Sequence, residues 1–405
     1  MNFNQFNLDS RLNAGIKKSG YHNPTPIQES AIPLAMAGHD LIGTAQTGTG
    51  KTAAFVLPIL HKLLSKPGNQ TRALIITPTR ELADQILQSI RELKGGANIS
   101  SIAIYGGVGP TEQIKSLRNN VQIVVACPGR LLDHIQSQHA KLGALEVLVL
   151  DEADRMLDMG FLPDIKRILQ HIPAKRQTML FSATFPKEIE QLALQTLHNP
   201  KRVSIGIARP AHTVSHTLYP VNQHRKKDLL LKLLERTDTN SVLVFTRTKH
   251  RARKLAKQIG QAGYKVTSLH GDRSQGQRSS ALDGFKKGTY QIMVATDIAA
   301  RGLDIDSISH VINFDIPDTA DAYIHRIGRT GRAKRTGEAF TLITPEDLNM
   351  VRTIEKIMNH KLAKQFLADF DYDAAPPQQP QNNRQPRAAQ PPANRARKKQ
   401  RAHYR

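Results

Sequence analysis

The sequence predicts an α/β protein that contains two doubly wound parallel sheets in tandem. Runs that are apolar throughout alternate with segments long enough to form helices, and this pattern indicates parallel strands covered on both faces. The first set of runs spans residues 40–44, 73–77, 121–126, 147–151 and 178–182, and the second spans 241–246, 291–296, 310–314 and 339–343. With 405 residues, the chain is long enough to give each sheet its own domain and core.

The two domains are expected to meet at a short linker. The segment "GIARPAHTV" (Gly206–Val214) contains a glycine and a proline and has no hydrophobic periodicity. It divides the chain into a first domain of residues 1–206, a linker of residues 207–214 and a second domain of residues 215–370. A cleft between two such domains suits a ligand that closes them together.

A disordered tail is expected to follow the second domain, over residues 371–405. This stretch is rich in Pro, Gln, Asn and Arg and nearly lacks aliphatic residues, so it cannot bury enough apolar surface to offset its ordering entropy. Its eight basic and two acidic residues carry a net charge of +6, which leaves +17 of the total +23 for the folded part. We therefore expect a basic surface on the folded domains as well as a basic tail.

Composition narrows the class of protein. Lys and Arg number 57 against 34 Asp and Glu, and the resulting pI near 10.2 indicates a polyanionic partner, either nucleic acid or an anionic membrane. No apolar stretch approaches the roughly 20 residues of a membrane span, and the start "MNFNQFNLDS" lacks a signal-peptide pattern. A single cysteine excludes an internal disulfide framework and a Cys-rich zinc site. These features predict a cytoplasmic nucleic-acid-binding protein that does not associate with a membrane.

The strongest local signal is "LIGTAQTGTGKTAAF", in which an apolar strand leads into a glycine-rich loop and then a helix. Such a loop turns backbone N–H groups toward phosphates, and the helix N-terminus adds partial positive charge. Lys51 is expected to reach the terminal phosphates, and the Thr52 hydroxyl is expected to bind Mg²⁺. The general phosphate-loop pattern has its first glycine where this chain has Ala45. The loop residues expected to contact the nucleotide are Ala45, Gln46, Thr47, Gly48, Thr49, Gly50, Lys51 and Thr52.

Acidic residues crowd the end of another apolar run, in "EVLVLDEADRML" (Glu146–Leu157). Carboxylates so close together repel one another and are costly to desolvate. An acidic turn exposed to water is one interpretation, but a phosphate loop also needs a second acidic strand end that holds Mg²⁺ and orients water. We therefore expect Asp151 to contribute to the metal site and Glu152 to act as the base or to orient water.

A basic loop in the second domain could complete such a site. The segment "HRIGRTGR" (His325–Arg332) offers Arg326, Arg329 and Arg332 on a loop interrupted by glycines. Phosphoryl transfer often uses an arginine finger to stabilise charge on the γ-phosphate in the transition state. Since this loop belongs to the other domain, catalysis would wait for the two domains to close. A solvated basic loop is the alternative for this segment taken alone.

Taken together, these motifs resemble those of the DEAD-box RNA helicases. "AQTGTGKT", "PTRELA", "DEAD", "SAT", "ATDIAARGLDI" and "HRIGRTGR" occur in the order and spacing of that family. The resemblance covers nearly everything from Phe3 to about Ala368, and the short body with a basic tail is most similar to the bacterial RhlE-type branch. It implies two RecA-like domains, ATP and Mg²⁺ as cofactors, and RNA, as a single strand or short duplex, as the partner.

The resemblance also implies roles for residues around the nucleotide. "GYHNPTPIQ" resembles the adenine-recognising Q motif, in which Gln28 would bind the base, with Tyr21 in the same motif and Phe3 as an upstream stacking aromatic. Asp304 would hold the ribose, and Arg301 would join a cross-domain network near the phosphates. The catalytic residues implied are Lys51, Asp151, Glu152, Ser182, Thr184, His325, Arg329 and Arg332, with the last two as arginine fingers and the "SAT" pair linking the nucleotide state to strand separation.

RNA contacts are likewise implied by the resemblance. They are Pro78, Thr79, Arg80, Gly106, Gly107, Gly129 and Arg130 in the first domain, and Arg247, Gly271, Gln275, Arg278 and Thr296 in the second. The absence of Trp and the low aromatic content, 5%, independently favour a protein that binds the RNA backbone rather than one that stacks bases. Cys127 replaces the usual Thr in "ACPGR", so one RNA contact would be weaker.

Three functions fit these features. The first is RNA-stimulated ATP hydrolysis coupled to local unwinding or remodelling of short RNA duplexes, without sequence specificity. The second is an ATP-gated RNA clamp that holds partners and turns over incidentally, and the third is a DNA translocase, which rests only on the two-domain ATPase layout. We expect the first function in a monomer, with ribosome-assembly or RNA-decay factors among its protein partners.

Overall fold

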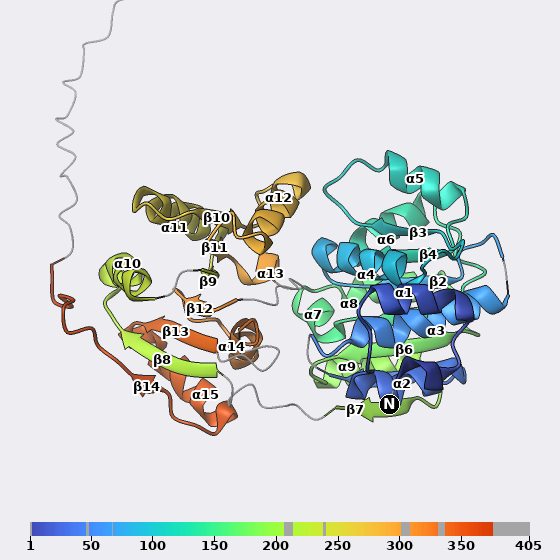
Figure 1. Ribbon diagram of the computed structural model, residues 1–405, viewed down its shortest axis with the longest axis horizontal. Coiled ribbons are helices and arrows are strands. Elements are labelled where there is room, and N and C mark those ends of the chain that lie inside the picture. Colours follow the sequence, from blue (N-terminus) through green and yellow to red (C-terminus); the bar gives the residue numbers. More distant parts are fainter. Residues whose placement is uncertain are drawn as a thin grey trace, which may run out of the picture.

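Two parallel sheets, formed by consecutive parts of the chain, organise the protein. The structure, a computed structural model, describes residues 2–45, 48–66, 68–205, 214–237, 240–300, 308–330 and 337–375. Within this part of the chain each sheet has seven strands, and Figure 1 shows the two sheets in separate bodies, each flanked by helices. The predicted α/β fold with two doubly wound RecA-like domains is confirmed.

The first sheet places the ends of its central strands side by side. Its strand order is β3-β4-β2-β5-β6-β1-β7, and all neighbouring strands are parallel. The register pairs Thr44 of β1 with Ser182 of β6, while Asp151 follows β5 immediately, so these residues share the carboxyl edge of the sheet. The strands are β1 (Leu41–Thr44), β2 (Ala73–Ile76), β3 (Ser101–Ile104), β4 (Ile123–Ala126), β5 (Val147–Leu150), β6 (Gln177–Ser182) and β7 (Lys201–Ser204).

Helices cover both faces of the first sheet because its central strands are apolar on both sides. Ile75 of β2 packs in the cluster that includes α3 and α4, whereas its neighbours Leu74 and Ile76 pack in the cluster that includes α6, α8 and α9. The helices are α1 (Asn13–Lys18), α2 (Pro26–Met36), α3 (Lys51–Ser65), α4 (Arg80–Leu93), α5 (Thr111–Arg118), α6 (Pro128–Gln136), α7 (Ala153–Asp158), α8 (Leu162–Leu169) and α9 (Lys187–Thr196). Two short 3₁₀ helices, η1 (Phe3–Phe6) and η2 (Ser10–Leu12), precede them.

The second sheet repeats this architecture with the order β10-β11-β9-β12-β13-β8-β14, again entirely parallel. Its strands are β8 (Val214–Pro220), β9 (Val242–Phe245), β10 (Val266–Leu269), β11 (Ile292–Ala295), β12 (His310–Asn313), β13 (Gly337–Ile343) and β14 (Ala363–Lys364). Helices α10 and α11 contribute to one core cluster, and residues of α12 to α15 pack in the clusters on the other face. The helices are η4 (Gln223–Arg225), α10 (Lys226–Arg236), α11 (Lys249–Gln261), α12 (Gln275–Lys286), α13 (Asp297–Ala300), α14 (Ala320–Ile327), η5 (Pro345–Asp347) and α15 (Leu348–Met358).

All nine apolar runs identified in the sequence form strands, and the described residues form five further strands. Four of them, β3, β7, β10 and β14, lie at the sheet edges, where one side of the backbone is unpaired and polar residues are tolerated. The fifth, β8, has the mixed sequence "VSHTLYP" and begins at Val214, which had been expected to end the linker. Residues 206–213, the rest of that linker, lie outside the described residues.

Residues 371–375, where the sequence predicts the start of the disordered tail, contact the second domain. Tyr372 packs its ring against Phe370 with centroids 4.8 Å apart, and its hydroxyl accepts a 2.9 Å hydrogen bond from the Leu367 amide. Arg225 donates to the Asp371 carbonyl from both Nε and Nη2, at 3.1 and 2.9 Å. These contacts hold residues 371–375 on the second domain, because one aromatic ring supplies the apolar surface that the rest of the tail lacks. The remaining tail, 376–405, lies outside the described residues.

A search of the described helices finds none with the length and apolar composition needed to cross a bilayer.

Candidate active site

The glycine-rich loop joins β1 to α3 at the carboxyl edge of the first sheet. Gly48 and Gly50 have φ angles of 85° and 90°, a left-handed conformation that favours glycine, and Gly50 is the N-cap of α3. Lys51, buried at the start of the helix, donates a 2.7 Å hydrogen bond from Nζ to the Ala45 carbonyl. The lysine therefore lies folded over the loop, as a phosphate-binding lysine must.

Gln28 connects the Q motif to this loop. Its Oε1 accepts a 2.9 Å hydrogen bond from the Thr25 amide, and its Nε2 donates a 3.0 Å bond to the Gly50 carbonyl. The side chain is buried, so it positions the loop directly. Nearby, Phe3 packs edge-on against both Phe6 and Tyr21, with centroids 5.7 Å apart in each pair, and is part of the domain core.

Asp151 and Glu152 are held at the end of β5 in a strained, buried turn. Glu152 has a φ of 53°, a left-handed conformation that costs a non-glycine residue of order 1–3 kcal/mol. Its side chain pairs with Arg155 at 2.5 Å, with both side chains almost fully buried. Burial raises the pKa of Asp151 to about 7; Lys51 opposes this shift and Glu152 adds to it. Such strain and an elevated carboxyl pKa are features of functional sites.

The third acidic residue of this turn, Asp154, joins it to the "SAT" segment. Its Oδ2 accepts hydrogen bonds from the Thr184 amide at 2.9 Å and from the Thr184 hydroxyl at 3.1 Å. The Ser182 hydroxyl accepts a 3.1 Å bond from the Asp154 amide and donates a 2.7 Å bond to the Thr184 carbonyl. These hydrogen bonds connect the acidic turn directly to Ser182 and Thr184.

The donor set suits a hard cation such as Mg²⁺. The Asp151 carboxylate and the Thr52 hydroxyl offer oxygen ligands, and a cation would favour the charged form of Asp151 that burial disfavours. Among the described residues, no three His, Cys, Asp or Glu side chains come together to hold a metal ion.

The arginines of the basic loop have different environments. Arg326 is almost fully buried, and its guanidinium forms a bidentate pair with Asp297 at 2.6 Å and donates to Asn313 and to the Asp315 carbonyl. It therefore stabilises the second domain and has no geometry for a phosphate. Arg329 is also buried, but it lines a small cavity that Arg155 of the first domain shares.

His325 marks the point where the two domains meet. Burial lowers its pKa to about 4, with a further lowering by Arg155 and a counteracting effect of Asp154, which are both first-domain residues. Arg329 and Glu152 act on the same imidazole. The basic loop of the second domain thus faces the acidic turn of the first.

A second contact between the domains lies further along the cleft. The Arg278 guanidinium donates from Nε to the Glu81 carboxylate at 2.7 Å, and both side chains are largely buried. Arg278 had been expected to contact RNA; in this structure its charge is balanced by Glu81 of the other domain.

Predicted RNA contacts of the first domain come together around a glycine pair. Arg80 lies directly over Gly107, since a Cβ added there would come within 2.2 Å of the Arg80 guanidinium. Gly106 lies near the guanidinium groups of both Arg80 and Arg130, and Arg130 donates a 3.3 Å bond to the Val108 carbonyl. Thr79 is the N-cap of α4, with Pro78 immediately before it, and Gly129 belongs to α6 beside Arg130.

Cys127 is the N-cap residue of α6 but makes no side-chain capping bond. Burial raises the pKa of its thiol to about 12, so the reactive thiolate is not populated at neutral pH.

In the second domain, Gln275 is the most informative of the predicted RNA contacts. It is buried at the start of α12, yet neither of its amide atoms has a hydrogen-bond partner within the described part of the chain. A buried amide without partners is costly, so it calls for a partner that the described part of the chain does not supply. Gly271 precedes the same helix, Thr296 follows β11, and Arg247 donates its backbone amide to Asp315 at 2.9 Å.

Several predicted site residues fall outside the described residues, namely Gln46, Thr47, Arg301, Asp304 and Arg332. Conversely, Glu81, Asp154 and Arg155 have contacts that sequence reasoning did not assign. Glu81 lies within the motif "PTRELA" and Arg155 directly follows "DEAD", but nothing in the sequence indicates their partners.

Comparison with known proteins agrees with this site. A family model described as DEAD/DEAH box helicase matches residues 25–192, and one described as helicase conserved C-terminal domain matches residues 225–334. The ATP-dependent RNA helicase CshA of Listeria monocytogenes is 44% identical over 361 residues, which are 89% of this chain and 69% of that protein. The chain belongs to the DEAD-box RNA helicase family. As a DEAD-box protein it is an ATP-hydrolysing RNA helicase.

Other DEAD-box proteins show the same likeness. RhpA of Helicobacter pylori is 42% identical over 89% of this chain and 73% of its own. The structure of S. cerevisiae Dbp5 bound to RNA and ADP BeF3 has a TM-score of 0.80 at 30% identity, covering 90% of this chain and 95% of Dbp5. A DEAD box protein from Methanococcus jannaschii, at 38% identity, covering 90% of this chain and 99% of its own, has a TM-score of 0.53.

The expected RhlE-type branch is not supported. The relatives found are named CshA and RhpA, from Listeria, Bacillus and Helicobacter among others. A short body and a basic tail, on which the expectation rested, do not distinguish branches that share the same two domains.

Proposed function

We propose that the first domain binds ATP on the loop 45–52 and hydrolyses it at the acidic turn. Lys51 binds the terminal phosphates with a charge-assisted contact, and the loop amides bind phosphate oxygens. Thr52 and Asp151 would hold Mg²⁺, which neutralises phosphate charge when bound. Glu152 accepts a proton from the attacking water, and its ion pair with Arg155 fixes the direction in which its carboxylate points.

The second domain completes this site. Arg329, together with Arg332, stabilises negative charge on the γ-phosphate in the transition state. The observation that carries the proposal is that His325 and Arg329 of the second domain line one cavity with Arg155 of the first. Asp154 and Glu152 are near enough to raise the pKa of His325 against the effect of burial. Separation of the domains would put water between these arginines and the phosphate, and hydrolysis would then be slow.

RNA is proposed to control this closure by binding across both domains. The cluster around Gly107 and the unsatisfied Gln275 belong to different domains, so a strand that contacts both favours the closed arrangement. The TM-score of 0.80 to Dbp5 bound to RNA and ADP BeF3 supports an arrangement of the two domains similar to the one in that complex. If the closed arrangement of the domains has room for only one strand of a short duplex, closure would separate the two strands.

The proposed contacts are to the sugar-phosphate backbone of the RNA, so RNA binding does not depend on base sequence. Because one chain supplies both halves of the site, we propose that the helicase acts as a monomer, and we place it in the cytoplasm with its RNA.

The test is the ATPase rate of the full chain without nucleic acid, with single-stranded RNA and with DNA of the same sequence. RNA should stimulate hydrolysis strongly and DNA weakly. Equal rates in all three conditions would contradict RNA-controlled closure, and stimulation by DNA alone would favour the translocase.

A further inference from the structure

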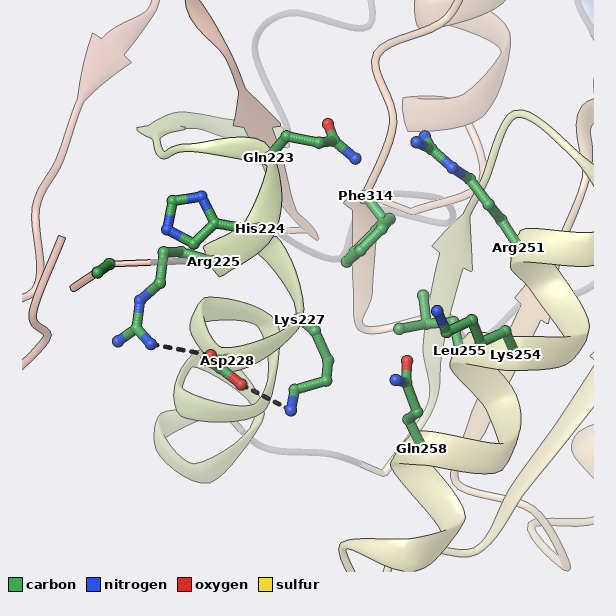
Figure 2. A pocket seen from close by; sticks show the side chains of 11 residues that line it. Gln223, His224, Arg225, Lys227, Asp228, Arg251, Lys254, Leu255, Gln258 and Phe314 are labelled. Atoms are coloured by element: carbon green, nitrogen blue, oxygen red, sulfur yellow. Dashed lines mark hydrogen bonds and ion pairs between the residues drawn. The ribbon is translucent and has the colours of Figure 1, made fainter. Parts of the chain in front are cut away.

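A pocket of about 460 Å³ opens on the second domain, outside the nucleotide cleft, between α10 and α11. Figure 2 shows Phe314 between the two helices, with Lys227 of α10 on one side and Arg251, Lys254 and Gln258 of α11 on the other. The α11 residues follow at intervals of three and four positions and therefore lie along one face of the helix. Phe314, with Leu255 of α11, provides apolar surface within a polar rim.

The pocket is positively charged. Arg225, Lys227, Arg251 and Lys254 line it, against a single carboxylate, Asp228. Asp228 pairs with both Arg225 and Lys227, as the dashed lines in Figure 2 mark. Lys254 forms no ion pair with any described residue, and α11 contains no acidic residue that could balance it. Lys254 is exposed and unpaired among the described residues, so its charge favours an anion at this pocket.

The pocket is continuous with a predicted RNA contact. The Asp315 carboxylate accepts the Arg247 amide at 2.9 Å through one oxygen and pairs with Arg251 at 2.5 Å through the other. Arg251 lines the pocket, so a path of adjacent groups leads from Arg247 to Lys254. The Asp315 carboxylate on this path is occupied by two donors, and Asp318 pairs with the Arg247 guanidinium at 3.3 Å. A polyanion bound at Arg247 would take the place of Asp318 at that guanidinium and would meet Arg251 next along the path.

The basic tail leaves from the same rim. Ala375, the last described residue, lines the pocket, and the preceding Ala374 carbonyl lies 2.8 Å from Nε2 of His224. Arg225 holds the Asp371 carbonyl and lies over the Phe370 ring at 4.9 Å. The residues that follow, 376–405, carry eight basic and no acidic side chains. The chain therefore enters its basic final segment from the rim of this pocket.

We propose that this pocket is an accessory RNA site, which binds the backbone of the strand extending beyond Arg247. Phosphates pair with Lys254 and Lys227, and the apolar surface of Phe314 and Leu255 accommodates a sugar or base. An acidic protein segment would match the charge equally well, but only RNA would be delivered by a contact at Arg247. The inference rests on the proposed function, since it takes Arg247 as an RNA contact.

The test compares two charge reversals on one helix, Lys254→Glu in the pocket and Lys257→Glu as a control that is exposed but does not line it. Affinity of the full-length chain is measured for a short RNA just sufficient to stimulate the ATPase, and for the same RNA extended by several nucleotides. Lys254→Glu should weaken binding of the extended RNA several-fold and lower its log affinity–log salt slope by about 0.7, the value for one phosphate on a single strand. Lys257→Glu should leave that slope unchanged.

RNA-stimulated hydrolysis with the short RNA should stay at the wild-type rate in both variants. If the short RNA fails to stimulate the wild-type chain, the proposed function fails instead of the accessory site. Equal weakening by the two reversals, or no weakening by Lys254→Glu, would overturn the accessory site.

A direct readout uses Gln258→Cys labelled with a photoactivatable thiol reagent, with Lys257→Cys as the matched control. Labelling is selective because burial raises the pKa of the sole native thiol, Cys127, to about 12. Cross-linking of the extended RNA to position 258 and not to 257 supports the proposal. Cross-linking of an acidic polypeptide but not of RNA would assign the pocket to a protein partner and refute it.

Discussion

The Arg278 guanidinium, on α12 of the second domain, donates a 2.7 Å hydrogen bond to the Glu81 carboxylate on α4 of the first. Both side chains are largely buried, so each depends on the other for charge compensation. The pair can exist only when the domains are together. It therefore stabilises the closed arrangement in which the acidic turn and the basic loop meet.

Exchanging the charges of Glu81 and Arg278 distinguishes a role in domain closure from direct RNA binding by Arg278. Glu81→Arg and Arg278→Glu should each lower RNA-stimulated ATPase at least about tenfold, since truncating one partner of a buried pair costs about 2–5 kcal/mol. The double exchange should recover much of the loss, measured with subsaturating RNA. If Arg278 acts only on an RNA phosphate, the double variant would be no better than Arg278→Glu.

Substitutions at Lys51 and Glu152 should affect different steps. Lys51→Ala should abolish ATP binding, because a charge-assisted phosphate contact is lost. Glu152→Gln should retain binding and slow hydrolysis at least about 10²-fold, as expected for loss of a general base, trapping a closed RNA complex. Fluorescent-nucleotide titration and single-turnover hydrolysis distinguish the two. Wild-type turnover in Glu152→Gln would exclude the assigned role.

Arg329→Ala and Arg332→Ala should remove most RNA-stimulated turnover. A finger contributes on the order of 10³ to 10⁵ in rate, whereas nucleotide binding to the first domain should not change. Arg326→Ala provides the contrast, because loss of its pair with Asp297 should lower the melting temperature. ATPase at saturating RNA and a thermal melt are measured for each variant. If Arg329→Ala has a normal ATPase rate and a lowered melting temperature, Arg329 stabilises the fold and is not an arginine finger.

Deletion of residues 376–405 should weaken RNA binding without unfolding the chain. The tail carries eight positive charges, and its removal should lower the log affinity–log salt slope because fewer counterions are released. Deletion from residue 371 should in addition destabilise the second domain, since Tyr372 and the Asp371 carbonyl are bound there. Identical melting curves for the two deletions would show that residues 371–375 contribute nothing to stability.

Acid should destabilise the second domain through His216. Burial lowers the pKa of this histidine from 6.5 to about 4. The unfolded chain therefore takes up a proton as the pH falls below about 6.5, while the folded chain does not until about pH 4. Stability should fall over this window by up to about 3 kcal/mol. His216→Gln should flatten the dependence of the urea midpoint on pH between 7 and 4. An unchanged slope would assign the acid sensitivity to other groups.

The fold was largely predictable because buried parallel strands are apolar throughout. β5, with "VLVL", packs on both faces and could hardly be missed. β7, with "KRVS", buries one residue at a sheet edge and is recognisable only from its pairing with β1. Asp371 was assigned to the tail because composition alone does not show that a single ring, Tyr372, finds a partner.

The sequence by itself determined the two α/β domains, the nucleotide loop with Lys51, and the acidic strand end with Asp151 and Glu152, because each depends on residues adjacent in the chain. Tertiary structure decided which charged groups lie next to one another. It paired Arg278 with Glu81, gave Arg326 to Asp297, and placed Arg329 beside Arg155. Sequence cannot distinguish arginines of one motif, since burial and ion pairing depend on side chains that only packing brings within a few ångströms of each other.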